Sequence, residues 1–245
     1  MDNVTSIALS RLVAQQRAND VTATNLANAA TPGFRAERVV FSDWLVKARG
    51  TTVPGNGTIA FTQDRATYRD THTGPLQHTA NPLDLAIGGD GYFSVQTPNG
   101  VRLTRAGHFS TSANGDIVDG QGNALLTATG GYLRLSPTDH EITIAADGTL
   151  TTNNGQIGRI GIVRPDNDQT LRAEGGQLSA ATSPTKTVVE PKLIQGAVEG
   201  SNIQPTVELT RMMSDLREFQ FTSELVQAEA DRQRAAIDKL TQTRS

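Results

Sequence analysis

The chain has 245 residues, of which 36% are hydrophobic, 19% charged and only 4% aromatic, and its formal net charge is −3. That length suffices for one large domain or two ordinary ones, and the charge gives no electrostatic footprint for nucleic acid. The sequence contains no cysteine and four histidines, which excludes disulfides and thiolate metal sites and leaves little for other metal chemistry. We therefore expect no enzyme, no cofactor and no nucleic-acid partner.

The N-terminal segment shows no targeting signal of the usual kind. Residues 1–6 lack the basic start and the apolar core of a cleavable secretory signal. No run of about 18 to 20 apolar residues is present, so we expect no direct membrane insertion. If the protein acts outside the cytoplasm, we expect it to be exported without a cleavable signal peptide.

Residues 1–30 contain neither glycine nor proline and predict a helix that stops at Thr31-Pro32-Gly33. Only four of these residues are charged, fewer than a solvated helix usually carries. The segment is therefore expected to be surrounded by other helices, or to be disordered until it packs. One line of side chains, at steps of three and four residues, contains Val4, Ile7, Arg11, Ala14, Ala18, Val21, Asn25 and Asn28. A second line contains Leu9, Leu12, Gln16, Asn19, Ala23, Leu26 and Ala30.

The middle of the chain, residues 35–200, is punctuated by Asn-Gly and Asp-Gly pairs such as Asp90-Gly91 and Asn114-Gly115. Such pairs supply the positive φ angles that tight hairpin turns require. Short β-prone runs lie between them, and no helical pattern interrupts them. Short β-prone runs separated by turn pairs predict a sandwich or barrel-like all-β domain over residues 76–200. A connecting extended or hairpin segment is expected before it, over residues 31–75.

The C-terminal region, residues 201–245, predicts a long helix with Ser201 or Asn202 as its cap and Pro205 in its first turn. An apolar line at alternating steps of three and four residues, here named the predicted seam, contains Leu209, Met212, Leu216, Phe219, Ser223, Val226, Ala230, Gln233, Ile237 and Leu240. A straight helix drifts by about 20° per heptad from such a line, so the pattern favours coiling on a partner. The alternative is an amphipathic helix lying on its own β domain, which a length of roughly 54 Å disfavours.

The candidate chemical sites are weak. The candidate acid pair of a glycosidase would come from Asp84, Asp90, Asp116 and Asp119. Asp90, Asp116 and Asp119 lie in or beside glycine-containing turns, where aspartate is favoured for backbone reasons alone. Asp166-Asn167-Asp168 starts like a calcium loop but lacks its glycine and its final acid. The glycine-rich residues 88–91 lead into a strand, which predicts a hairpin turn rather than a phosphate loop.

Three blocks of sequence carry a family resemblance. The first is ATNLANAATPGF over residues 23–34, and the second is DLAIGGDGYF over 84–93 with TRAGHF over 104–109. The third combines Gln195-Gly196, Ser201-Asn202-Ile203 and Arg217-Glu218-Phe219. In this order they resemble the bacterial flagellar basal-body rod and hook proteins. The resemblance covers nearly the whole chain, is weakest over residues 125–190, and is strongest to the proximal-rod members.

The resemblance implies a structural subunit of the flagellar basal-body rod in the periplasm. Its long terminal helices would pair as a coiled-coil assembly domain around the inserted β domain, giving an α+β fold. It would polymerise with itself and with other proximal and distal rod subunits, transmit torque, and leave the cell through the flagellar type III export apparatus. The alternatives are a distal-rod or hook paralogue and, in another class, a β-fold cell-wall hydrolase with helical tethers.

The expected assembly residues follow from the two helical patterns and the first sequence block. On the C-terminal helix they are Leu209, Met212, Leu216, Phe219, Val226, Ile237 and Leu240. On the N-terminal helix they are Val4, Ile7, Val21, Asn25, Leu26 and Asn28. The helix exit and its junction with the β domain are expected at Thr31, Gly33 and Phe34.

Overall fold

A computed structural model describes residues 2–47, 58–175 and 177–242 of the chain. They form two compact units, each built from segments that are distant in sequence. Unit 1 comprises Met1–Ala27, Glu37–Tyr68 and Gln204–Ser245, and unit 2 comprises Asn28–Ala36 and Arg69–Ile203. A helix near each end and a largely β domain between them confirm the predicted α+β class.

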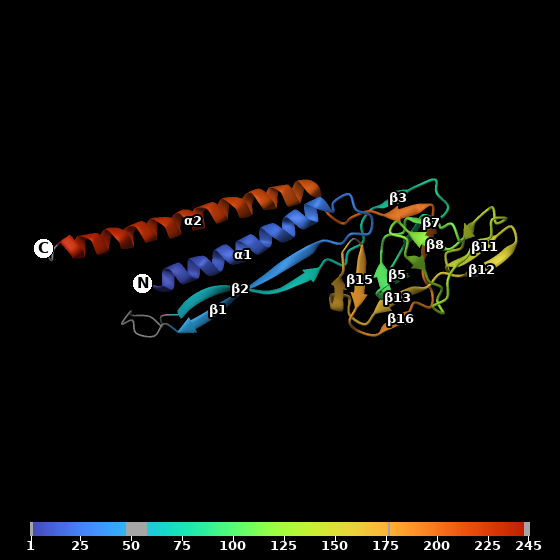
Figure 1. Ribbon diagram of the computed structural model, residues 1–245, viewed down its shortest axis with the longest axis horizontal. Helices are drawn as coiled ribbons and strands as arrows, with labels where there is room; N and C mark the ends of the chain where they lie inside the picture. The colour runs from blue at the N-terminus through green and yellow to red at the C-terminus, as the bar shows by residue number, and fades with distance from the viewer. Residues whose placement is uncertain (1, 48–57, 176, 243–245) are drawn as a thin grey trace. The chain divides into compact units, whose positions relative to one another are not determined.

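Unit 1 contains two long helices and a two-stranded ribbon. Helix α1 spans Asp2–Ala27 and helix α2 spans Pro205–Gln242. They run side by side in opposite directions, and Figure 1 shows the end of α2 extending past the start of α1. The ribbon consists of β1 (Glu37–Lys47) and β2 (Thr58–Arg69), and β1 packs beside α1.

The start of α2 differs in one respect from the sequence expectation. The helix begins at Pro205, whose fixed φ suits the first helical position. The backbone carbonyl of Gln204 accepts hydrogen bonds from the N–H groups of Val207 and Glu208. The prediction that Ser201 or Asn202 caps this helix is therefore wrong, because both residues lie too far upstream of its first turn.

Unit 2 is an all-β domain of many short strands. Their bounds are β3 (Leu76–His78), β4 (Leu85–Ile87), β5 (Tyr92–Thr97), β6 (Gly100–Thr104), β7 (Phe109–Thr111), β8 (Ile117–Asp119), β9 (Ala124–Leu125), β10 (Thr143–Ile144), β11 (Thr149–Thr152), β12 (Gly155–Arg159), β13 (Ile162–Pro165), β14 (Leu171–Ala173), β15 (Leu178–Ala181), β16 (Thr185–Thr187), β17 (Leu193–Gln195) and β18 (Ala197–Glu199). A 3-10 turn, Asp168–Thr170, precedes β14.

The strands pair antiparallel throughout unit 2. The largest sheet has nine strands, with the order β14-β15-β6-β5-β9-β8-β7 and with β13 joining β5 to β16. A three-stranded sheet has the order β10-β11-β12, and the pairs β17-β4 and β18-β3 complete the domain. The strand β4 pairs with β17 rather than β5, so the hairpin predicted at residues 88–91 is wrong.

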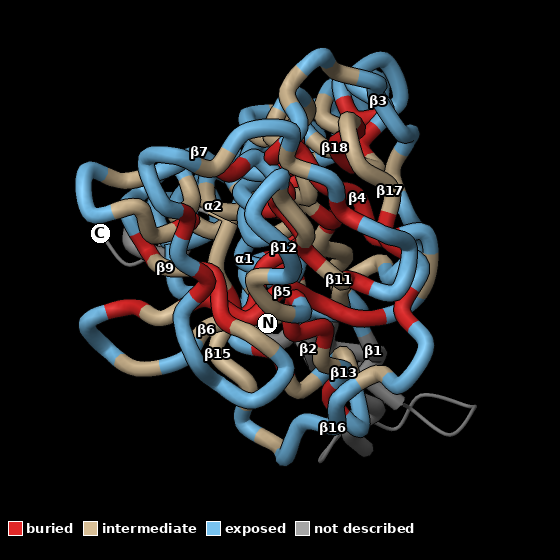
Figure 2. Tube along the Cα trace, turned by 90° about the vertical axis from the view of Figure 1, so that its right-hand side faces the viewer, coloured by how far each residue is buried: buried red, intermediate tan, exposed pale blue. Residues whose placement is uncertain are grey.

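The core of unit 2 is a cluster of aliphatic side chains around two aromatic rings. Phe93 and Phe109 are fully buried and meet edge to face, with ring centroids 5.2 Å apart. Figure 2 shows the buried residues in red in the interior of this unit, where β4 and β5 are buried along almost their whole length. Burial on both faces explains the continuous apolar run at 85–87 and the run at 92–95, which Ser94 alone interrupts.

Gly107 is a position where the packing of β4 admits no side chain. A Cβ atom built there would lie 1.6 Å from the backbone oxygen of Leu85, a residue that is itself buried and cannot easily be displaced. The carbonyl of Gly107 accepts a hydrogen bond from the N–H of Leu85, which holds the two segments together. A glycine is therefore needed for the close approach.

We expect Gly107→Ala to destabilise unit 2 by roughly 3 kcal/mol, because overpacking here displaces backbone. Calorimetric unfolding of the full chain measures the change. Gly120→Ala is the matched control, since nothing lies within 4 Å of the position that its methyl group would take, and it should shift stability by less than about 0.5 kcal/mol. Equal unfolding temperatures for the two variants would contradict the packing argument.

Candidate assembly interface

Helix α2 presents one partly covered face within unit 1. The residues on it are Glu208, which is buried, and the half-buried Met212, Asp215, Phe219, Thr222 and Val226. They follow steps of four and three residues, so they lie along one side of the helix. Met212, Phe219 and Val226 belong to the predicted seam, whereas the positions between them are polar.

Three further apolar members of the predicted seam are exposed in the subunit, whereas Ala230 and Gln233 are half-buried. Leu209, Leu216 and Ile237 have 47%, 43% and 59% of their surface accessible. The side chain of Leu240 lies outside the described residues. The predicted seam thus contains two sets of apolar side chains. Met212, Phe219 and Val226 are partly covered inside the subunit, and Leu209, Leu216 and Ile237 remain exposed.

On α1 the first of the two side-chain lines is the more covered. Val21 and Asn25 are buried and Ile7 and Asn28 are half-buried, while the side chain of Val4 lies outside the described residues. Leu26, on the second line, is also half-buried. Leu9 and Val13 are exposed large hydrophobic residues on the same helix. Both long helices therefore carry apolar side chains that unit 1 itself leaves accessible.

The covered faces of the helices are unusually polar. The carboxylate of Glu208 is buried and accepts a hydrogen bond of 2.6 Å from Arg38 on β1, and a longer one of 3.4 Å from Arg211. Further along, Gln15 and Arg11 donate to Glu218 at 3.3 and 3.5 Å. The contacts of Glu208 are buried, whereas Arg11 and Glu218 are more than half exposed. Specific polar contacts between helices favour one register over others, because a shift leaves them unpaired.

Asn25 joins the last turn of α1 to the start of the ribbon. Its side-chain amide donates to the carbonyl of Glu37 at 2.8 Å, and its oxygen accepts from the N–H of Glu37 at 2.9 Å. Both polar ends of the buried Asn25 side chain are therefore used inside unit 1. The structure gives Asn25 an internal positioning role at the helix exit.

The predicted exit residues form a turn inside unit 2. The N–H of Phe34 donates to the carbonyl of Thr31, and Gly33 has a φ of +70°, a left-handed conformation that favours glycine. Its N–H donates to the backbone oxygen of Glu199 at 2.8 Å. A Cβ atom on Gly33 would lie 2.5 Å from the backbone of Arg105 and Ala106, so the turn is closely packed.

Asn202 connects three separate segments of unit 2. Its side-chain oxygen accepts from the N–H of Ala36 at 2.8 Å, and its amide donates to the carbonyls of Asp70 and His72 at 3.3 and 3.0 Å. The N–H of Asp70 also donates to the carbonyl of Ala36. The sequence block around residue 202 thus marks a crossing point of the chain rather than a helix cap.

A buried charge cluster lies beside this crossing point. Arg105 and Glu199 form an ion pair with an Nη2–Oε2 distance of 2.7 Å, and both side chains are only 1% exposed. Arg105 also donates to the carbonyls of Gly89 and Gly91 at 2.9 and 2.7 Å. Burial lowers the pKa of the Arg105 guanidinium, and the charge of Glu199 opposes that shift.

Arg35 and Tyr92 extend the cluster. Arg35 donates to the Tyr92 hydroxyl at 3.1 Å and lies 3.9 Å from the Glu199 carboxylate. The guanidinium groups of Arg35 and Arg105 lie 5.5 and 5.9 Å from the centre of the Tyr92 ring. Burial raises the pKa of the Tyr92 hydroxyl, and the charge of Arg35 opposes that shift. This cluster was not predicted from the sequence, where a lone arginine inside the block TRAGHF is its only signal.

The residues considered for chemistry serve local structure. Asp84 is buried and contacts His108 and Asn81 at 2.7 and 2.8 Å, and Asp119 accepts turn hydrogen bonds from two following N–H groups. Asn167 caps the 3-10 turn. Within residues 2–47, 58–175 and 177–242, no group of three or more acidic or histidine side chains is arranged to hold a metal ion. Over the same ranges, neither helix combines the length and hydrophobicity that a membrane crossing requires.

We expect Glu199→Gln to destabilise unit 2 by about 3 kcal/mol or more, because it leaves Arg105 charged and unpaired in the interior. Hydrogen exchange of the unit 2 amides measures the local free energy of opening. Asp90→Asn is the control, since its ion pair with Arg164 is largely exposed and should contribute less than about 1 kcal/mol. Similar protection in both variants would refute a structural role for the buried pair.

Comparison with protein families gives three matches in chain order. Residues 6–35 match the model described as flagella basal body rod protein. Residues 86–170 match the flagellar hook protein FlgE/F/G D1 domain, and residues 194–239 match the flagellar basal body rod FlgEFG protein C-terminal region. The three matches cover both helices and much of the β domain.

Relatives of the chain carry the same description over almost their full length. The flagellar basal-body rod protein FlgF of Caulobacter vibrioides is 33% identical over 242 residues, covering 98% of each chain. FlgF of Mesorhizobium japonicum is 35% identical over 96% of each chain, and the rod protein FlgG of Bacillus subtilis is 32% identical over 84% of this chain and 87% of its own. These matches support a structural rod subunit rather than an enzyme. The chain belongs to the flagellar basal-body rod protein family and is similar to its FlgF members.

Proposed function

We propose that this protein is a subunit of the proximal part of the rod, and that it polymerises through its terminal helices with itself and with other rod subunits. In this proposal α1 and α2 pair as a coiled coil and continue the same packing with helices of neighbouring subunits. The β domain, with its sandwich or barrel-like sheets, is carried by this helical layer. Torque passes from subunit to subunit through the packed helices.

The observation that carries the proposal is the exposure of apolar side chains on both helices. Leu209, Leu216 and Ile237 remain accessible in the predicted seam, and Leu9 and Val13 remain accessible on α1. Exposed hydrophobic faces of this kind mark surfaces that other proteins cover. Because the two faces of a helix contact different neighbours, such contacts can be heterologous and build an open helical polymer.

The length of α2 adds to this argument. α2 has 38 residues and α1 has 26, and they run in opposite directions. The end of α1 and the start of α2 lie at the same end of unit 1 (Figure 1). α1 cannot cover the last turns of α2, where Ile237 is exposed. A helix end that α1 leaves uncovered, among the residues that the structure describes, is suited to insertion between the helices of another subunit.

The location and delivery of the protein follow from the same proposal. A rod subunit acts in the periplasmic part of the flagellar basal body and is delivered by the flagellar export apparatus. The cysteine-free composition is compatible with passage through a narrow channel as an unfolded chain, since no disulfide has to form or break.

We expect Leu216→Asp to reduce incorporation into rods by roughly tenfold or more, because a carboxylate in an apolar contact between helices is strongly unfavourable. Immunodetection of the tagged subunit in purified basal bodies measures incorporation, and swimming assays measure its consequence. The β domain should melt as in the parent chain, since residue 216 lies in unit 1.

Leu216→Met is the matched control, because it keeps an apolar side chain of similar volume. It should assemble like the parent chain. Detection of exported subunit separates a failure of assembly from a failure of export. Normal incorporation of the Leu216→Asp subunit would rule out this part of α2 as an assembly surface.

A further inference from the structure

A cavity of about 340 Å³ lies inside unit 1, where α1, α2 and the β1–β2 ribbon meet. We call it the helix–ribbon cavity. Its walls include the apolar side chains Val21, Phe41 and Tyr68 and the charged side chains Arg38, Arg211 and Asp215. All of these residues belong to unit 1.

Asp215 is the unusual member of this set. Within the part of the chain that the structure describes, its half-buried carboxylate has neither a hydrogen bond nor an ion pair. Burial raises the pKa of this carboxyl, the charge of Glu218 raises it further, and Arg211 only partly opposes them. Arg211 therefore compensates the charge of this carboxylate only in part.

The two arginines of the cavity are directed toward another acid. Arg38 and Arg211 both donate to the buried Glu208, at 2.6 and 3.4 Å. One further oxygen of Glu208 is buried without a hydrogen bond. The wall carries two carboxylates, Glu37 and Asp215, and the same two arginines. Because both arginines donate to Glu208 behind the wall, neither donates to Asp215. A cationic group is therefore the complementary occupant.

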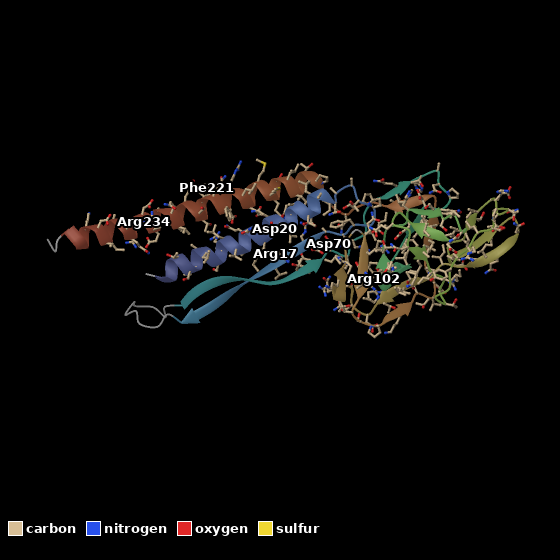
Figure 3. The ribbon with its side chains drawn as sticks, viewed as in Figure 1. Arg17, Asp20, Asp70, Arg102, Phe221 and Arg234 are labelled. Atoms are coloured by element: carbon tan, nitrogen blue, oxygen red, sulfur yellow. The ribbon has the colours of Figure 1, made fainter. Side chains whose placement is uncertain are left out.

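The opposite side of the same helix carries an unpaired cation. Arg217 is exposed, and the described residues provide no hydrogen bond or ion pair for it. It lies in a row at steps of four residues with Met213, Phe221 and Leu225, which are 56%, 71% and 56% exposed. We call these four residues the outer row; Figure 3 marks Phe221 on the side of α2 away from α1. An arginine among exposed apolar side chains is a typical composition for the centre of a protein interface.

We propose that the guanidinium of Arg217 enters the helix–ribbon cavity of a second copy of this chain and pairs there with Asp215. Tyr68 and Phe41 offer aromatic rings beside it, and the apolar neighbours of the outer row cover the cavity mouth. This inference rests on the proposed function and names a specific contact within it.

The positions on the helix determine the kind of assembly. Residues two apart on an α-helix point about 200° from each other, so Asp215 and Arg217 face opposite sides of α2. Each copy can then donate an arginine to one neighbour and accept one from another. Such a contact is heterologous and repeats along a row of copies instead of closing a pair.

The test uses the absence of native cysteine. One tagged copy carries Ala18→Cys in the cavity wall, and a differently tagged copy carries Ser214→Cys, one turn from Arg217. Both are expressed together, basal bodies are purified, and a short bis-maleimide links nearby thiols. We expect a crosslinked product that contains both tags, while the proposed charge pair itself stays intact.

Charge reversal then tests the pair. Arg217→Glu in the Ser214→Cys copy, or Asp215→Arg in the Ala18→Cys copy, should each lower the crosslink yield by roughly tenfold, and the two together should restore it. Arg217→Lys keeps the positive charge and should retain most of the yield. Arg234→Glu is the matched control on α2 and should have no effect. Because Arg217 is exposed, its variants do not threaten the fold of unit 1.

The outcomes separate this inference from the proposed function. A mixed-tag product that is insensitive to Arg217→Glu, or no mixed-tag product in rods that contain the subunit, overturns the inference and leaves the rod assignment standing. A link from Ser214→Cys to a cysteine introduced into a different rod protein, with no mixed-tag product, overturns the second copy as the occupant. Absence of both tagged copies from purified rods overturns the proposed function, and the inference with it.

Discussion

The buried carboxylate of Glu199 is the charge whose compensation holds several segments of the β domain together. It pairs with Arg105, lies close to Arg35 and accepts a hydrogen bond from the N–H of Gly74 at 3.2 Å. These four residues come from separate parts of unit 2. An unpaired charge in such an interior is very unfavourable, so the segments must stay together for the carboxylate to remain compensated.

The neighbouring contacts extend the same constraint with neutral groups. The carbonyls of Gly89 and Gly91 accept from Arg105, and the side chain of Asn202 joins three backbone segments. Glycine at positions 33 and 107 allows the backbone segments to approach closely enough for these contacts. Parts of the three blocks that carry the family resemblance, including Gly33, Arg105 and Asn202, thus lie at a crossing of chain segments in unit 2.

Unit 1 differs from unit 2 because several large apolar side chains on its two helices remain accessible. The covered face of α2 contains Glu208 and Asp215 where a closed two-helix coil would have apolar residues, while Leu209 and Leu216 remain exposed. Polar groups inside the pair favour one register, and apolar groups on other sides of the helices remain accessible. This division agrees with the family to which the chain belongs, whose members are structural subunits of the flagellar rod.

The sequence alone determined the fold class, the two terminal helices and the family, because glycine-free segments, regular turn pairs and three ordered blocks depend on local chemistry. It placed the hairpin at residues 88–91 and the cap of α2 incorrectly, because the carbonyls of the loop and the amide of Asn202 bond to partners far along the chain. Only the tertiary structure decided which members of the predicted seam are covered and that Arg105 meets Glu199. Helical periodicity identifies an apolar line, but which side of it is covered depends on α1 and the ribbon, whose positions no local pattern specifies.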